Sequence, residues 1–140
     1  MKKLLNKKGF TLMEMLIVVA IIVILVAVSV PTFTSQLDKA NQATDLANER
    51  SAKGLANTMA MLDEVEYPAN TTTATYYYDA ANGKLVNSDA NIDGYGMSSS
   101  LADDSIATGN GVPKDGIVKV TFTETNGTTT MTYEWVTVSE

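Results

Sequence analysis

The clearest pattern in this chain is a long apolar run close to its N-terminus. Residues 15–28 carry no polar side chain, and the apolar stretch extends from Phe10 to Phe33 with few interruptions. As a helix rising about 1.5 Å per residue, these 24 residues reach about 36 Å, enough to cross a bilayer. The pattern predicts a transmembrane helix at residues 10–31.

A helical periodicity continues beyond this run and predicts an amphipathic continuation of the helix at residues 32–66. Pro31 removes one backbone hydrogen bond and is expected to bend the helix, and Pro68 is expected to end it. Polar residues, Asp45 and Glu49 among them, lie between the stripe positions. The stripe consists of Phe33, Leu37, Ala40, Ala43, Ala47, Ala52, Leu55, Met59 and Leu62.

Residues 67–140 have the pattern of an antiparallel sheet, with variable loops at about residues 87–116. Asn82-Gly83 separates residues 75–79 from 84–86, and Asn126-Gly127 separates residues 117–125 from 128–138. Asn-Gly between two alternating segments is a strong hairpin signal. One apolar face of each later strand is expected to pack on the helix: Val118, Val120 and Phe122, and Met131, Tyr133 and Trp135. The predicted fold class is therefore α+β.

Glu14 is the one charge inside the apolar run. A carboxylate in hydrocarbon costs about 2.5–3.5 kcal/mol on insertion scales, so such a residue normally has a partner and a function. The run is preceded by Lys2, Lys3, Lys7 and Lys8 without any acidic residue, which predicts a cytoplasmic N-terminus.

Three interpretations of the segment compete. It could be a secretory signal peptide cleaved after the small residues Ala27-Val28-Ser29, or a permanent single-pass anchor. In the third, cleavage between Gly9 and Phe10 leaves the helix in the mature protein and creates an amine close to Glu14. We favour the third interpretation, because it alone supplies a partner for the carboxylate.

The residues KKGFTLMEM, followed by an apolar helix with Pro31, closely resemble the class III leader of the type IV pilin and pseudopilin family. The resemblance covers about the first quarter of the chain. It implies that residues 1–9 are a leader removed by a prepilin peptidase and that Phe10 becomes the N-methylated first residue. It also implies assembly roles for Glu14 and for Pro31, which matches the proline that kinks the family's long helix.

The expected function is that of a major-type pilin, a structural subunit polymerising with itself into a surface filament. The resemblance implies further partners: an assembly platform, a motor ATPase and, before assembly, the cytoplasmic membrane. The charge of Glu14 would pair with the N-terminus of a neighbouring subunit. Two alternatives stay open: a pseudopilin of a secretion or DNA-uptake system, and a membrane-anchored adhesin that does not polymerise.

Composition narrows these possibilities. The chain has 140 residues, ten basic against 16 acidic, and cleavage after Gly9 would leave six basic residues. This acidity argues against nucleic acid as the default partner. The absence of cysteine differs from the C-terminal disulfide of many Gram-negative pilins and favours a Gram-positive or pseudopilin-like member. Without histidine or cysteine the usual nucleophile–base pairs are missing, so no enzyme is expected.

One motif concerns a metal. Asp89, Asn91 and Asp93, followed by Gly94, match the opening of a calcium loop, in which oxygen ligands alternate and glycine makes the sharp turn. The closing glutamate of such a loop is replaced by Ser100, and only Asp103 or Asp104 could substitute. A solvated turn is the simpler interpretation, so no cofactor is predicted and calcium is a secondary hypothesis.

Overall fold

The computed structural model describes residues 9–98, 106 and 112–138. The leader lysines, Ser100, Asp103 and Asp104 lie outside these ranges. The chain divides into two compact units, residues 1–37 and residues 38–140. One helix, α1 (Leu12–Met61), has residues in both units, and the second unit adds four strands. The predicted α+β class is confirmed.

Helix α1 ends at Met61, earlier than the predicted end of the amphipathic segment at residue 66. Asp63 adopts the left-handed conformation with φ 56°, and the Glu64 N–H donates to the Met59 carbonyl at 3.0 Å. This is the hydrogen bond of a Schellman motif, with aspartate at the position where glycine is usual. The helix therefore terminates through its own backbone geometry seven residues before Pro68.

The sheet is antiparallel, with strand order β2-β1-β3-β4. Its strands are β1 (Thr73–Asp79), β2 (Lys84–Val86), β3 (Gly116–Thr125) and β4 (Thr128–Thr137). Strands β3 and β4 pair without a bulge along their whole length, and β2 pairs only with the end of β1. The Asn126-Gly127 hairpin is confirmed: both residues have positive φ, 53° and 76°, as a type I′ turn requires.

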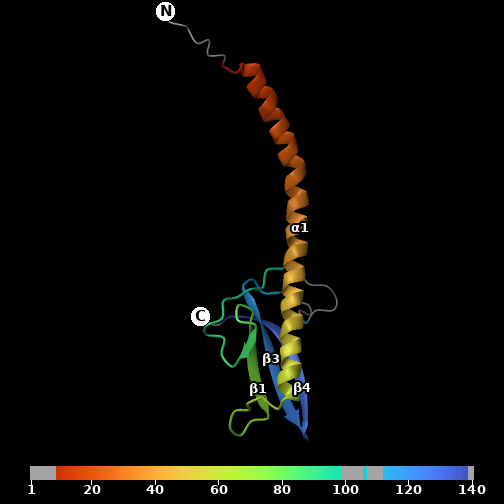
Figure 1. The fold of residues 1–140 in the computed structure, drawn as a ribbon, viewed down its shortest axis with the longest axis vertical. Coiled ribbons are helices and arrows are strands. Elements are labelled where there is room, and N and C mark those ends of the chain that lie inside the picture. Colours follow the sequence, from red (N-terminus) through yellow and green to blue (C-terminus); the bar gives the residue numbers. More distant parts are fainter. Residues whose placement is uncertain (1–8, 99–105, 107–111, 139–140) are drawn as a thin grey trace, which may run out of the picture. The chain divides into compact units, whose positions relative to one another are not determined.

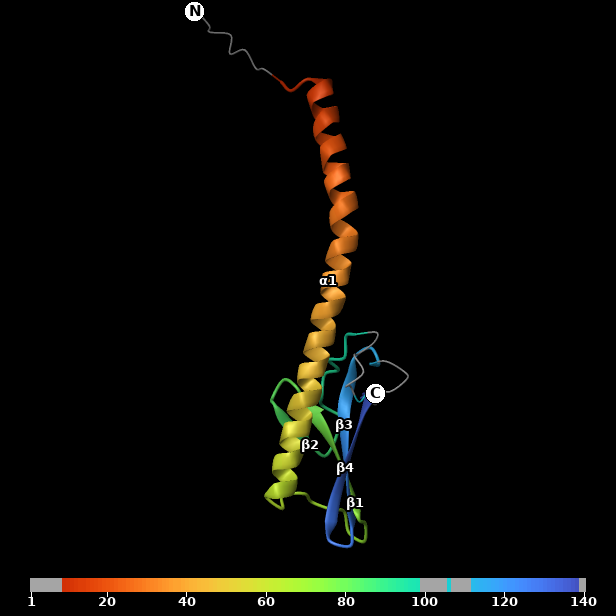
Figure 2. The same ribbon diagram turned by 90° about the vertical axis from the view of Figure 1, so that its right-hand side faces the viewer.

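The core of the second unit lies between one face of α1 and one face of the sheet (Figures 1 and 2). Ala52 and Ala56 provide the helix side, and both are fully buried. The sheet side is the apolar face that sequence alternation predicts, with Val118, Val120 and Phe122 fully buried. That prediction is confirmed.

The predicted helix stripe is confirmed at Ala52, Leu55 and Met59, which belong to the core or pack against it. It is wrong at Ala43, Ala47 and Leu62, which are exposed. The buried face instead runs through Asp45, Glu49, Ala52 and Ala56, four positions in steps of four, three and four residues. The helical period was therefore predicted correctly, but the phase was wrong before Ala52, where two carboxylates occupy the buried positions.

Candidate functional site

The first turn of α1 is held by a reciprocal contact between Thr11 and Glu14. The Thr11 backbone N–H and hydroxyl both donate to Glu14 Oε2, at 2.7 and 2.9 Å, and the Glu14 N–H donates to the Thr11 hydroxyl at 3.2 Å. This is a capping box, in which threonine and the glutamate three residues later satisfy backbone donors that the helix leaves unpaired. Sequence reasoning missed this second role of Glu14, although the order Thr-x-x-Glu signals it.

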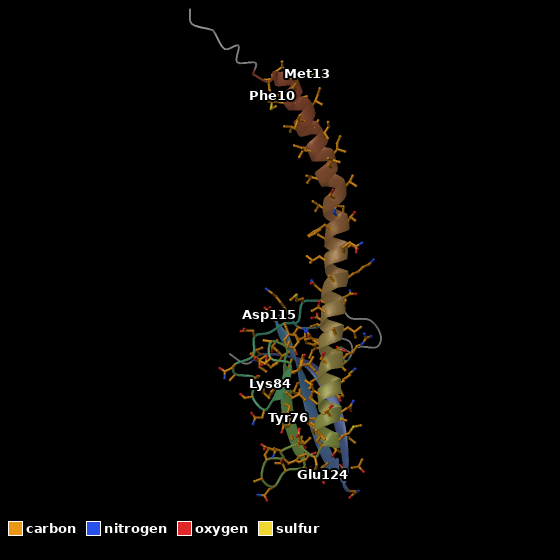
Figure 3. All side chains as sticks on the ribbon, in the orientation of Figure 1. Phe10, Met13, Tyr76, Lys84, Asp115 and Glu124 are labelled. Carbon is orange, nitrogen blue, oxygen red and sulfur yellow. The ribbon has the colours of Figure 1, made fainter. Side chains whose placement is uncertain are left out.

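The other carboxylate oxygen of Glu14, Oε1, makes no hydrogen bond within the described chain. The neighbouring Phe10 is 81% exposed, and Figure 3 shows Phe10 and Met13 beside each other at this end of the helix. A side chain at Gly9 would meet no atom within 4 Å. Gly9, Phe10 and Glu14, the three residues assigned to processing and assembly, thus lie together in an open segment.

The apolar half of α1 makes no core with the rest of the described chain. Every residue from 9 to 40 is exposed, including Ile17, Ile24 and Val28. Within the described part of the chain, α1 is the one helix long and apolar enough to cross a membrane. Such a surface requires lipid or other helices around it.

The hydroxyls within this apolar half are satisfied by the helix itself. Ser29 donates to the Leu25 carbonyl at 2.7 Å, and Thr32 and Thr34 make equivalent contacts with earlier carbonyls. In an apolar environment this removes the cost of unpaired polar groups. The helix continues through Pro31, and the bend that this proline is expected to cause stays a prediction.

A second polar site lies on α1 in the other unit, where Asp45 and Glu49 are both fully buried. Asp45 Oδ2 accepts three hydrogen bonds, from the Met97 N–H at 3.0 Å, the Ser98 N–H at 2.7 Å and the Ser98 hydroxyl at 2.6 Å. Asp45 thereby holds the segment that follows the calcium-like motif against the helix.

Glu49 accepts a hydrogen bond from the Trp135 indole N–H at 2.7 Å and a longer one from the Ile106 N–H at 3.3 Å. The indole ring packs edge-on against Tyr95, with ring centroids 5.6 Å apart. Trp135 is therefore a core residue, as predicted. Burial also raises the pKa of Tyr95, whose hydroxyl donates to the Tyr78 carbonyl.

The calcium motif does not form a cluster in the described chain. The Ile92 N–H donates to the Asp89 carbonyl at 3.1 Å, which makes a turn, and Asn91 and Asp93 are exposed. Gly94 has a local explanation, since a side chain there would overlap the backbone of Asp115. No group of three metal-binding acidic, histidine or cysteine residues occurs among the described residues. Calcium binding stays a prediction.

Comparison with known proteins identifies the N-terminal segment. Residues 4–30 match the model of the prokaryotic N-terminal methylation motif. The chain is also similar to the type IV narrow pilus major component PilA5 of Thermus thermophilus, with 50% identity over 56 residues. That match covers 38% of this chain and 48% of the relative, so the chain spans about half the length of the relative. No solved structure matches the chain.

Proposed function

We propose that this chain, which carries an N-terminal methylation motif and is similar to a type IV pilin, is the structural subunit of a type IV filament. The observation that carries this proposal is the position of Glu14. It stands inside the matched motif, at the start of an apolar helix half that has no partner within the described chain.

Processing would occur between Gly9 and Phe10. The open surroundings of Gly9 leave room for a side chain, so the packing of the described chain does not require glycine there. A prepilin peptidase that reads a small residue at its cleavage point would explain the choice. Hydrolysis of the Gly9–Phe10 bond would remove the leader and free the Phe10 amine, which carries a positive charge. A separate transfer from a methyl donor would then give the N-methylated first residue.

The two carboxylate oxygens of Glu14 differ in their hydrogen bonds, and this difference supports a role in assembly. Oε2 is occupied by Thr11, and Oε1 is open to a donor from outside the chain. The Phe10 amine of a neighbouring subunit could therefore bind Oε1 without disrupting the capping box. A buried charge without a partner is heavily penalised, so this pairing favours one axial register between subunits.

The exposed apolar half of α1 fits two successive environments. In the precursor it would lie in the cytoplasmic membrane, and in the filament it would pack among the same segments of other subunits. The assembly platform and motor ATPase expected for such a system would act on the subunit between these two states. The sheet-containing unit would face the outside of the cell.

The test is N-terminal and intact-mass analysis of the chain purified from filaments and from the membrane fraction of its native host. The expected filament form begins at Phe10 and carries one additional methyl group. A chain that keeps Met1 and never leaves the membrane fraction would overturn the proposal and favour an anchored binding module. Recovery only in short envelope-bound fibres would assign the chain to the pseudopilins instead.

A further inference from the structure

Part of the edge of β1 carries no strand within the described chain. Strand β1 begins at Thr73, but β2 pairs with it only at Tyr77–Asp79. Strand β3 covers the other side of β1 from Thr73 to Tyr77. On the side of β1 that faces away from β3, residues 73–76 therefore have no strand beside them in the described chain.

The backbone groups at this edge can be assigned from the ladder. The Glu124 N–H donates to the Thr72 carbonyl at 2.8 Å, so residue 72 points its backbone groups toward β3. Because antiparallel strands alternate, Thr73 and Thr75 point theirs away from β3. The Thr73 carbonyl is taken by the Thr71 hydroxyl at 3.1 Å. The Thr73 N–H and the N–H and carbonyl of Thr75 then point away from β3, toward the side without a neighbouring strand.

A cavity of about 420 Å³ lies against this edge. Its lining includes Tyr67, whose hydroxyl is buried and has no hydrogen-bond partner among the described residues. The Glu66 N–H donates to the Tyr76 hydroxyl at 3.0 Å, which ties the segment that contains Glu66 and Tyr67 to strand β1 (Tyr76 is labelled in Figure 3). The lining residues are Glu66, Tyr67, Pro68, Thr73, Thr75, Tyr76 and Asn87.

We propose that this cavity binds an extended peptide segment carrying a basic side chain, which adds to β1 as a short strand. Unpaired backbone donors and acceptors at strand spacing recognise a peptide backbone, which a saccharide does not reproduce. Glu66 carries the one carboxylate in the lining, and no lysine or arginine is present to oppose a basic side chain. The inference concerns the second unit alone and does not depend on polymerisation.

The direct test is NMR of the full-length chain in detergent micelles with a defined probe. The probe is an acetylated and amidated pentapeptide with a central lysine between two threonines and a valine at each end. We expect saturable shifts at the backbone amides of Thr73 and Thr75. Two control peptides are N-methylated, one on the lysine and both valines, the other on both threonines. In a strand only one of these two sets of N–H groups points toward β1. The peptide methylated on that set should lose binding, because it lacks the donors that pair with β1.

Three variants make the test specific to this cavity. Tyr67→Phe removes only a buried hydroxyl, and we expect it to leave binding unchanged, because that hydroxyl has no accessible surface in the cavity. Tyr77→Phe is the matched control, since Tyr77 lies on the same strand outside the cavity lining, and it should leave binding unchanged. Glu66→Gln should abolish the preference for a lysine-centred over a glutamate-centred peptide.

Several results would overturn the proposal. One is unshifted Thr73 and Thr75 amides at millimolar peptide. Another is undiminished binding by both N-methylated peptides. A third is a preference for the lysine-centred peptide that persists in the Glu66→Gln variant. Shifts of the same amides by chitohexaose, with none caused by the peptide, would reject the peptide in favour of a saccharide site.

Discussion

At the scale of single residues, two carboxylates on α1 show how differently the same chemistry is used. Glu14 is exposed and caps the helix from which it projects, with one oxygen engaged and one open. Asp45 is fully buried and binds the backbone of a distant segment. The order Thr-x-x-Glu signals the cap made by Glu14, but no residue close to Asp45 in the sequence signals its burial.

Replacement of Asp45 by alanine should be strongly destabilising. It would leave the buried N–H and hydroxyl of Ser98 and the partly buried N–H of Met97 without their acceptor. Since each unsatisfied buried donor costs about 1–3 kcal/mol, we expect the free energy of unfolding to fall by at least about 2 kcal/mol. Chemical denaturation followed by Trp135 fluorescence measures this.

Asp38→Ala is the matched control for that measurement. Asp38 lies on the same helix, is exposed and accepts a single hydrogen bond from Gln42. We expect a change of no more than about 0.5 kcal/mol for this surface site. Equal effects of the two variants would contradict the anchoring role of Asp45.

Replacement of Thr11 by valine should loosen the first turn of α1. Valine keeps the branched shape but removes both hydroxyl contacts with Glu14, which is typically worth about 1 kcal/mol at an N-cap. Amide hydrogen exchange of residues 12–15 in micelles should accelerate about fivefold. Thr44→Val, which removes a hydroxyl bonded within the helix, should leave these amides unchanged.

At the scale of elements, each boundary depends on the conformation of one or two residues. Thr11 begins α1, Asp63 ends it through its left-handed backbone, and Asn126 and Gly127 turn β3 into β4. The hairpin was predictable because Asn-Gly has a strong preference for the I′ turn. The helix end was not, because aspartate adopts the left-handed conformation much less readily than glycine.

Two glycine-to-alanine replacements test whether backbone conformation or available space decides how an added methyl group changes stability. An added side-chain carbon would meet no atom within 4 Å at either Gly54 or Gly127. Gly54 lies within α1, so alanine should stabilise the chain by up to about 1 kcal/mol. Gly127 has φ 76°, so alanine should destabilise it by about 1 kcal/mol or more.

Thermal unfolding followed by circular dichroism should therefore move in opposite directions for the two variants. Because both are the same chemical change in open space, each serves as the control for the other. A shift of the same sign for both would show that backbone conformation does not decide the effect.

At the scale of the whole molecule, the chain combines an apolar helix half that buries nothing with a second unit that has its own core. The described residues of the first are all exposed, and an apolar surface of this size marks a contact with lipid or protein. The proposed filament supplies such contacts, and the charge on Glu14 is the feature that would make their packing selective.

Replacement of Glu14 by glutamine tests that selectivity. Glutamine still accepts the Thr11 hydrogen bonds of a capping box, so the helix start should persist while the charge is lost. We expect cleavage at Gly9 to continue and filament yield to fall at least tenfold, measured by shearing filaments from cells and quantifying the chain. Undiminished yield would refute a role for the charge in assembly.

Glu14→Val, which removes both the charge and the cap, distinguishes the two contributions. If glutamine and valine reduce yield equally, the charge accounts for the effect. A loss with valine alone would assign the effect to the capping box.

The sequence by itself determined the features that depend on local pattern. The apolar run, the Asn-Gly hairpin, the alternating faces of β3 and β4, and the Gly-Phe-Thr-Leu-Met-Glu motif are all contained in short windows of residues. Hydrophobic period, turn geometry and motif order need no distant partner, so they can be read directly.

Only the tertiary structure decided which face of α1 is buried and where the open edge of β1 lies. Asp45 and Glu49 are buried because Ser98, Ile106 and Trp135, all at least 53 positions further along the chain, donate hydrogen bonds to them. The phase of a helix against a sheet is fixed by such long-range contacts. A buried acidic residue whose hydrogen-bond donors lie far along the chain has no local signature, so the sequence pattern assigned those two residues to the polar positions.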